Sequence, residues 1–178
     1  LGMDGEGDCV EVIQDIPEIN FTIELQFRTL FPNVGIFAVL AGPAGEAGHD
    51  RHIHLQDGFL RQRIYDGEAI TSAHSGFNDG LWHHYAMVVE QGIGQKMYVD
   101  GQIEASGSKD HSDFDWQDRF WIGFSNDALD KFFAGQIDEV RIWKYARTQE
   151  QIQDAMNRTL TDEEINSGNV VGYWNFDD

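Results

Sequence analysis

The sequence is poor in cysteine, proline and basic residues. Its single cysteine, Cys9, excludes an intrachain disulfide and a zinc-finger framework. Only 12 lysine and arginine residues stand against 31 aspartate and glutamate residues, which gives a formal net charge of −19. Such a surface repels nucleic acid and anionic membranes, and no apolar run approaches the length of a membrane span. We therefore expect no nucleic-acid partner and no membrane insertion, whereas a secreted protein or bound cations would suit this charge.

The chain of 178 residues is long enough to bury one sizeable core. No low-complexity linker or internal repeat divides it, so we expect residues 1–178 to form a single domain. The one loose stretch is 41–50, rich in small residues, which we expect to form a mobile rim. The sequence begins without methionine or a signal peptide and ends directly after a strand-like run. This is typical of a module excised from a larger secreted or cell-surface protein.

Short runs of β-branched and aromatic residues recur along the chain, bounded by glycine or aspartate. Residues 21–28 alternate apolar and polar side chains, whereas residues 35–42 are apolar on both faces. Asp-Gly pairs at 57–58, 66–67 and 100–101 follow such runs and predict tight hairpins, whose two central residues need positive φ. Helical patterns occur only after residue 148. We predict an all-β jelly-roll sandwich of two antiparallel sheets, with one or two short helices near the C-terminus.

A two-residue hairpin at each of the first two Asp-Gly pairs predicts how the neighbouring strands align. The predicted partners are His52 with Arg63, His54 with Arg61, Arg63 with Ile70, and Arg61 with Ser72. One face of this ribbon is then polar and carries His52, His54, Arg61, Arg63, Tyr65, Glu68 and Ser72. The opposite face is predicted to be core and carries Ile53, Leu55, Leu60, Ile64, Ala69, Thr71 and Ala73.

The polar face of this ribbon gathers basic side chains in a very acidic chain. Planar guanidinium and imidazole groups beside a tyrosine ring can bind the hydroxyls, carboxylates or sulfates of a glycan. The alternative is a solvated outer face held by cross-strand pairs. The two histidines also have a spacing that zinc sites use, but the predicted pairing brings no third ligand near them. The candidate ligand-binding residues here are His52, His54, Arg61, Arg63 and Tyr65.

Several motifs, taken in order, resemble a known family. They are DGEGDCVEV at the amino end, LWHHYAMVV, KMYVDGQ, FAGQIDEVRIWKYARTQEQI and the closing VVGYWNFDD. From Asp4 to Asp178 the chain resembles the laminin-G-like members of the concanavalin A-like lectin/glucanase superfamily. The resemblance implies a jelly roll of two curved sheets, often with a structural calcium ion, that binds glycans or proteins. It leaves function open, because the fold hosts lectins, enzymes, adhesion modules and spacers.

The adjacent histidines His83 and His84 follow Trp82 in one of these motifs. Neighbouring side chains on a strand point to opposite faces, so the two histidines cannot share one site unless the backbone bulges. The resemblance implies that this stretch is a packing signature ahead of the Tyr-Val-Asp-Gly hairpin. We therefore expect structural roles for Trp82 and for one of the histidines.

A calcium site is predicted near the strand GQIDEVRIW. Strict alternation places Asp138 on the same face as Val140 and Ile142, toward an apolar interior. A carboxylate there is energetically costly unless its charge is compensated. A calcium ion, which takes six to eight oxygen ligands, would compensate it. The resemblance implies that this aspartate binds calcium together with oxygens of the amino-terminal segment, where Asp4 and Asp8 are the further candidates. The calcium would be structural; the alternative is that Asp138 pairs with a basic side chain or caps a loop.

Two other segments are candidates for ligand binding. In pentraxins, distant relatives in this superfamily, an acidic loop in the region after WIGFS binds calcium that contacts ligand. The corresponding residues here are Asn126, Asp127 and Asp130, although SNDALDK is shorter and lacks the glutamine-rich pentraxin pattern. The alternative is a plain polar turn. Trp116, in the polar stretch SDFDWQD, could stack on a sugar ring or cover a sheet edge.

No catalytic motif is present, and no catalytic residue is assigned. The Glu-x-Asp-x-Glu pattern of glycosidases in this superfamily is missing, as are Gly-x-Ser-x-Gly, a Walker loop and His-Glu-x-x-His. We predict a non-catalytic, calcium-stabilised module that binds a glycan or cell-surface polysaccharide. The alternative is a protein-interaction or spacer domain of an adhesin, without a sugar site.

Overall fold

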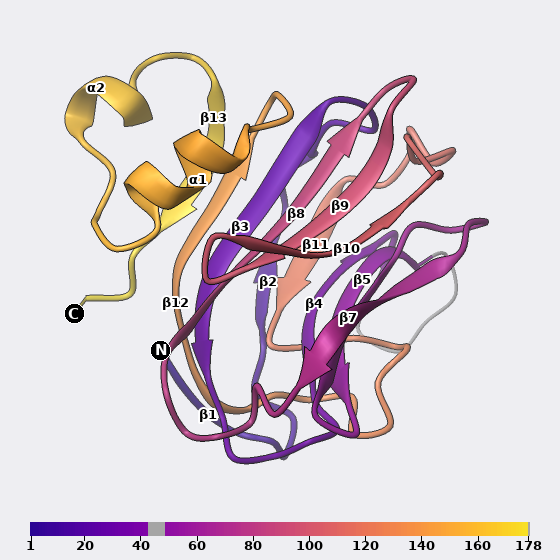
Figure 1. Ribbon diagram of the computed structural model, residues 1–178, viewed down its shortest axis with the longest axis vertical. Helices are drawn as coiled ribbons and strands as arrows, with labels where there is room; N and C mark the ends of the chain where they lie inside the picture. The colour runs from indigo at the N-terminus through magenta and orange to yellow at the C-terminus, as the bar shows by residue number, and fades with distance from the viewer. Residues whose placement is uncertain (43–48, 178) are drawn as a thin grey trace.

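A computed structural model describes residues 1–42 and 49–177 of the chain. Two antiparallel sheets face each other, and two short helices lie outside one of them near the carboxyl end (Figure 1). This confirms the predicted all-β jelly roll. Residues 43–48, most of the expected rim loop, lie outside the described residues. Among the described helices, none is long and apolar enough to cross a membrane.

The first sheet has seven strands, in the order β1-β12-β3-β8-β9-β10, with β13 also paired to β12. Their bounds are β1 (Gly2–Asp4), β3 (Phe21–Arg28), β8 (His83–Glu90), β9 (Gly94–Val99), β10 (Gln102–Gly107), β12 (Ala134–Trp143) and β13 (Val170–Trp174). The long strand β12 pairs with β1 through its first half and with β13 through its second. The first and last strands of the chain are therefore both held by β12.

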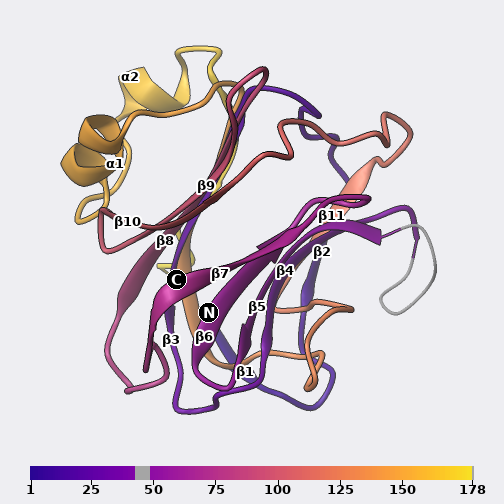
Figure 2. The same cartoon turned by 45° about the vertical axis from the view of Figure 1, so that its right-hand side comes forward.

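The second sheet has six strands, in the order β2-β11-β4-β5-β6-β7. Their bounds are β2 (Val10–Val12), β4 (Gly35–Leu40), β5 (His49–Gln56), β6 (Phe59–Arg63), β7 (Ala69–Ser75) and β11 (Arg119–Ile122). Figure 2 shows this sheet as a layer separate from the first.

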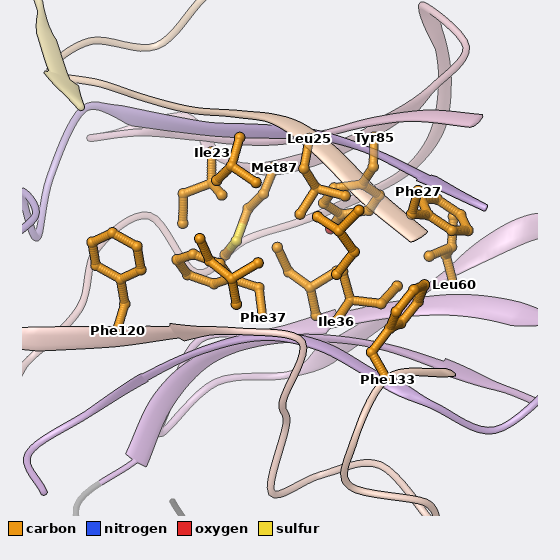
Figure 3. Packing of buried hydrophobic residues seen from close by; sticks show 14 of the residues in the cluster. Ile23, Leu25, Phe27, Ile36, Phe37, Leu60, Tyr85, Met87, Phe120 and Phe133 are labelled. Carbon is orange, nitrogen blue, oxygen red and sulfur yellow. The ribbon is translucent and has the colours of Figure 1, made fainter. Parts of the chain in front are cut away.

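The core lies between the two sheets. Apolar residues of β3 and β8 point down onto those of β4, β6 and β11 (Figure 3). The alternation in β3 places Phe21, Ile23, Leu25 and Phe27 in the core with no exposed surface. Strand β4 is buried on both faces, as its continuous apolar run predicts, because Ala38 and Leu40 pack against Phe124 on the outer side.

The helices are α1 (Gln149–Ala155) and α2 (Asp162–Ile165). Each begins with a threonine N-cap, Thr148 or Thr161, in a capping box that satisfies free amide groups of the first turn. Ile152 of α1 is fully buried against Ala86, Val88 and Tyr98 on the outer face of the first sheet. Helix α1 therefore covers part of that face, as Figure 1 shows.

Two of the predicted hairpin turns are confirmed and one is wrong. At 57–58 and 100–101 both residues have positive φ, and the flanking strands pair as a two-residue turn requires. At 66–67 neither residue has positive φ; the amide of Gly67 donates instead to the carbonyl of Ile64 (2.7 Å). The alignment of β6 and β7 therefore differs by one residue from the prediction, so Arg61 pairs with Thr71 and Arg63 with Ala69.

This one-residue difference reverses the faces of β7. Ser72, predicted on the polar outer face, is buried, and so is Ile70. The residues predicted to be core, Ala69, Thr71 and Ala73, are exposed instead. The predictions for β5 and β6 are confirmed, because Ile53, Leu55 and Leu60 lie in the core.

The prediction that Asp138 faces the apolar interior is also wrong. The pairing of β12 with β3 shifts between Asp138 and Arg141, and Glu139 there has a φ of 51°. This β-bulge adds a residue to the strand and changes the phase of its alternation. Asp138 pairs with Gln26, whose side chain reaches the carbonyl of Met156 after α1, so it lies on the outer face. The core positions around the bulge are Ile137, Val140 and Ile142.

Candidate functional site

The segment 125–131 crosses the outer face of the second sheet at Gly35. A Cβ atom at Gly35 would lie 2.2 Å from the carbonyl oxygen of Lys131 and 2.3 Å from the amide nitrogen of Ser125. The backbone of the segment therefore rests directly on β4, where only glycine leaves room for it. It also covers the neighbouring strand β5, where His52 has no exposed surface and His54 is 4% exposed. The two candidate histidines lie under this segment and not on open surface.

The covering segment joins two sets of candidate residues that the sequence treated separately. The carboxylate of Asp127 accepts two hydrogen bonds from Arg63, at 2.6 Å from Nε and 2.8 Å from Nη2. Such a bidentate pair fixes the plane of the guanidinium group. Burial raises the pKa of the Asp127 carboxyl, but the hydrogen bonds from Arg63 and the nearby positive charge outweigh burial, and the net shift is downward.

Beyond Arg63, aromatic rings continue along the surface. The guanidinium carbon of Arg63 lies 5.5 Å from the centre of the Tyr65 ring. The Tyr65 ring is 5.3 Å from that of Phe114, which meets Trp116 edge-on at 5.5 Å. Tyr65 is 44% exposed and Trp116 53%. We call Tyr65, Phe114 and Trp116 the aromatic strip; the sequence predicted its two ends as candidates and missed Phe114.

A buried carboxylate, Asp50, holds the two halves of the aromatic strip together. Its Oδ1 accepts a hydrogen bond from the amide of Tyr65 (2.6 Å), and its Oδ2 accepts one from the hydroxyl of Ser112 (2.5 Å). Arg51 compensates its charge, with 3.2 Å between Nε and Oδ2. The Ser112 hydroxyl in turn accepts a hydrogen bond from the amide of Phe114 (3.2 Å). Asp50 has no exposed surface, so it acts through the backbone it fixes and not by touching a ligand.

The remaining candidates on this face have different surroundings. Burial lowers the pKa of His54 to about 4, and among the described residues its Nδ1 has no hydrogen-bond partner. Arg61, its cross-strand neighbour, is half-buried. Asn126 is half-buried, and Asp130 is exposed with its backbone tied to Gly35 and Asn33. Arg61 lies on the same strand as Arg63, and Asp130 belongs to the covering segment that carries Asp127.

The three carboxylates predicted to bind calcium do not share one site. Asp4 accepts a hydrogen bond from the amide of Glu6 (2.7 Å), and Asp8 accepts a long one from the amide of Asp4 (3.4 Å). Asp4 pairs with Ala134, which is four residues from Asp138 along β12, or ~13 Å. Within the described ranges no three His, Cys, Asp or Glu residues are placed to hold a metal ion. Asp4, Asp8 and Asp138 thus do not fit one calcium ion, and calcium binding by the chain stays a prediction.

His83 and His84 make separate contacts. His83 lies between two carboxylates, with Nδ1 2.9 Å from Asp100 and Nε2 3.2 Å from Asp79. The hydrogen bond to Asp100 raises the pKa of His83 in spite of partial burial. The Nε2 atom of His84 lies 3.1 Å from the carboxylate of Glu24, beneath α1. Each histidine therefore has a packing role through a partner of its own.

The fold and its ordered motifs define a laminin-G-type jelly roll. The chain belongs to the Concanavalin A-like lectin/glucanases superfamily, since the Laminin_G_3 model of that superfamily matches residues 5–153. This confirms the resemblance that the sequence motifs carry.

Solved structures with the same fold include proteins described as sugar-binding. A putative carbohydrate binding protein from Bacteroides ovatus has a TM-score of 0.73 at 19% identity, over 95% of this chain and 49% of that one. Domain 4 of AbnA, an extracellular arabinanase from Geobacillus stearothermophilus in complex with arabinotriose, has a TM-score of 0.61 at 20% identity, over 88% of this chain and 75% of that one. At these identities the likeness shows the fold alone.

A rat protein, "Sushi, von Willebrand factor type A, EGF and pentraxin domain-containing protein 1", is 29% identical over 121 residues. The match covers 61% of this chain and 3% of the rat protein. The chain likewise spans about half the length of the Bacteroides ovatus protein. Each of these relatives is therefore much longer than the matching domain.

Proposed function

We propose that this domain is a non-catalytic carbohydrate-binding module, with the aromatic strip and Arg63 as its ligand surface. One observation carries the proposal: Tyr65, Phe114 and Trp116 form an exposed, continuous row of rings that a buried carboxylate holds in place. Aromatic faces pack against the apolar faces of sugar rings. Two structures of similar fold, described as carbohydrate-binding and as bound to arabinotriose, support the same ligand class.

The chemistry of the strip favours a polysaccharide over an isolated charged group. Arg63 is already neutralised by Asp127, so the pair offers donors and acceptors to hydroxyl groups without net charge. Because Asp50 and Asp127 hold the surface in place, little conformational freedom is lost on binding. The surface is open and excludes little water, so we expect modest affinity for a single chain. The extracellular arabinanase among the similar structures supports a secreted or cell-surface setting.

The proposal is tested by binding to a panel of soluble and insoluble plant, algal and bacterial polysaccharides. We expect the wild-type domain to bind at least one of them, and Trp116→Ala and Tyr65→Ala each to weaken binding at least tenfold without lowering the melting temperature. Ile103→Ala is the matched control, because Ile103 is 52% exposed on β10 of the other sheet.

Two results would contradict the proposal. If Trp116→Ala and Ile103→Ala bind equally well, the aromatic strip is not the ligand surface. If the folded wild-type domain binds no polysaccharide, the protein-interaction or spacer role becomes the better account.

A further inference from the structure

A groove of about 330 Å³ lies at one end of the first sheet, where β3 ends and β12 begins (Figure 1). It is lined by Leu30 and Phe31 of the β3–β4 loop and by Ala134 at the start of β12. Leu30 is 71% exposed and Phe31 is 53% exposed. Large apolar side chains that stay in contact with water beside a groove indicate a surface that a ligand covers.

Hydrogen bonds fix the loop that forms the groove. The carbonyl of Thr29 accepts a hydrogen bond from the amide of Gly80 (3.0 Å), which joins the β3–β4 loop to the loop before β8. The Thr29 hydroxyl donates to the carbonyl of Ala134 (2.6 Å) and accepts from the amide of Phe31 (3.0 Å). The groove is therefore preformed, and little conformational freedom is lost when a ligand binds.

One end of the groove carries a positive charge without a counter-charge. Arg28 and Gln136 line this end, and Nη2 of Arg28 donates a hydrogen bond to Oε1 of Gln136. The guanidinium carbon of Arg28 lies 5.4 Å from the centre of the Trp82 ring. In the part of the chain that the structure describes, no carboxylate forms an ion pair with Arg28, in contrast to the pair of Arg63 with Asp127. Further N–H groups of the Arg28 guanidinium therefore remain for a ligand.

The lining of the groove favours an anion with an apolar body. Arg28 is the only charged residue among the described residues that line the groove. The net charge of −19 repels an anion at long range, but at physiological ionic strength this repulsion is screened beyond about 8 Å. The charge inside the groove therefore has the larger effect. A carboxylate matches it best, because a guanidinium donates two parallel hydrogen bonds to the two carboxylate oxygens.

We propose that this groove binds an aliphatic carboxylate, such as a fatty acid of medium chain length. Arg28 holds the carboxylate, and the alkyl chain covers Leu30 and Phe31 and contacts Ala134. The volume of about 330 Å³ is at the lower end of the range of about 300–1,000 Å³ for small-molecule sites, which suits a chain of this size. The inference does not depend on the aromatic strip, since no residue of the strip lines the groove.

The test uses the domain with ¹³C-labelled leucine and isoleucine methyl groups, titrated with octanoate below its micelle concentration. We expect the methyl resonances of Leu30 to shift while those of Ile93 stay unchanged. Ile93 is a suitable reference because it is 61% exposed but lies in the β8–β9 turn, at the end of β8 away from Trp82. Octanol lacks the carboxylate and acetate lacks the alkyl chain, so each should bind at least tenfold more weakly than octanoate.

Arg28→Gln tests the contribution of the charge. The variant should bind octanoate at least tenfold more weakly than the wild type, at the level of octanol, and its affinity for octanol should be unchanged. Lys144→Gln is the matched control, because it removes the same charge from an exposed side chain outside the groove. Leu30→Ser tests the apolar wall and should weaken octanoate binding without lowering the melting temperature.

Three results would overturn the inference: octanoate leaves the Leu30 resonances unmoved, octanol binds as tightly as octanoate, or Arg28→Gln and Lys144→Gln bind octanoate equally well. Each of them is compatible with polysaccharide binding that Trp116→Ala weakens, so the proposed function would stand. Conversely, octanoate binding by a domain that binds no polysaccharide would keep the groove as a site and remove the aromatic strip. The two proposals therefore fail separately.

Discussion

The outer faces of the two sheets bury charged groups in different ways. On the first sheet, Glu24 has no exposed surface and lies between Arg147 and His84, while Arg147 also donates to the carbonyl of Gln151 at 2.7 Å. On the second sheet, the Arg63–Asp127 pair is part-exposed, with side chains 18% and 20% exposed. The closed cluster fastens α1 to its sheet. The open pair leaves polar groups at the surface, which is where a ligand can reach them.

The largest expected effect separates these two kinds of ion pair. Glu24→Gln leaves Arg147 buried without its charge partner, and we expect the free energy of unfolding to fall by about 3–5 kcal/mol. The matched change on the other sheet, Asp127→Asn, should cost only about 1–2 kcal/mol, because water can solvate Arg63. Urea unfolding of both variants measures the difference. Equal losses would mean that the two faces do not differ as described.

The next effect is a dependence of stability on pH that arises from His54. Its pKa is lowered from 6.5 to about 4, so the folded state binds fewer protons than the unfolded state between these values. The contribution of His54 to the free energy of unfolding is therefore fully present above pH 6.5. It falls by up to about 3 kcal/mol as the pH decreases toward 4. On the first sheet the pH dependence is opposite. The pKa of His83 is raised, so its contribution to the free energy of unfolding is lost as the pH rises through this raised pKa.

The measurement is urea unfolding between pH 4 and 8 for the wild type and His54→Gln. We expect the variant to lose less stability than the wild type as the pH falls from 6.5. Carboxylates titrate in both proteins, so the difference between the two curves isolates the histidine. Parallel curves would show that His54 is solvated in the folded protein.

The smallest effect is expected from calcium. Asp4 pairs with Ala134, which lies ~13 Å from Asp138 along β12, so the carboxylates of Asp4 and Asp138 do not meet at one ion. We expect the melting temperature to be only slightly higher in millimolar calcium than in EDTA, because calcium binding stays the prediction from the sequence although these carboxylates lie apart. A clear rise in the melting temperature on adding calcium, abolished by Asp138→Asn, would support the calcium site predicted from the sequence. Oxygens of the backbone would then be its other ligands.

Much of the fold could be predicted because its signals are local. The alternation in β3 and the Asp-Gly pairs at 57–58 and 100–101 each report on residues next to them in the chain. The wrong predictions, for β7 and for Asp138, occur where a shift of one residue changes which side chains of a strand face the core. Nothing in the local pattern distinguishes the bulge at Glu139 from regular alternation, and the pair at 66–67 has the same composition as the two pairs that do form hairpins.

The candidate site was predicted in parts but not as a whole. Arg63, Tyr65, Trp116 and Asp127 were each named from residue type, yet their proximity depends on how segments 64 residues apart cross the second sheet. Asp50 was not predicted as a site residue. It accepts hydrogen bonds from the backbone amide of Tyr65 and the hydroxyl of Ser112, and such contacts leave no periodic pattern in the sequence. The burial of His52 likewise depends on a segment that is distant in sequence.

The contact between Gly35 and the segment 125–131 has a consequence for protein engineering. Exposed positions such as Leu129 and Trp116 can be randomised to alter specificity, since their side chains do not support the sheets. Gly35 cannot be replaced, because any side chain there would push the segment 125–131 away from β4 and move Asp127 away from Arg63. A library for new ligands should therefore keep Gly35 and Asp50 constant and vary the surface that they hold.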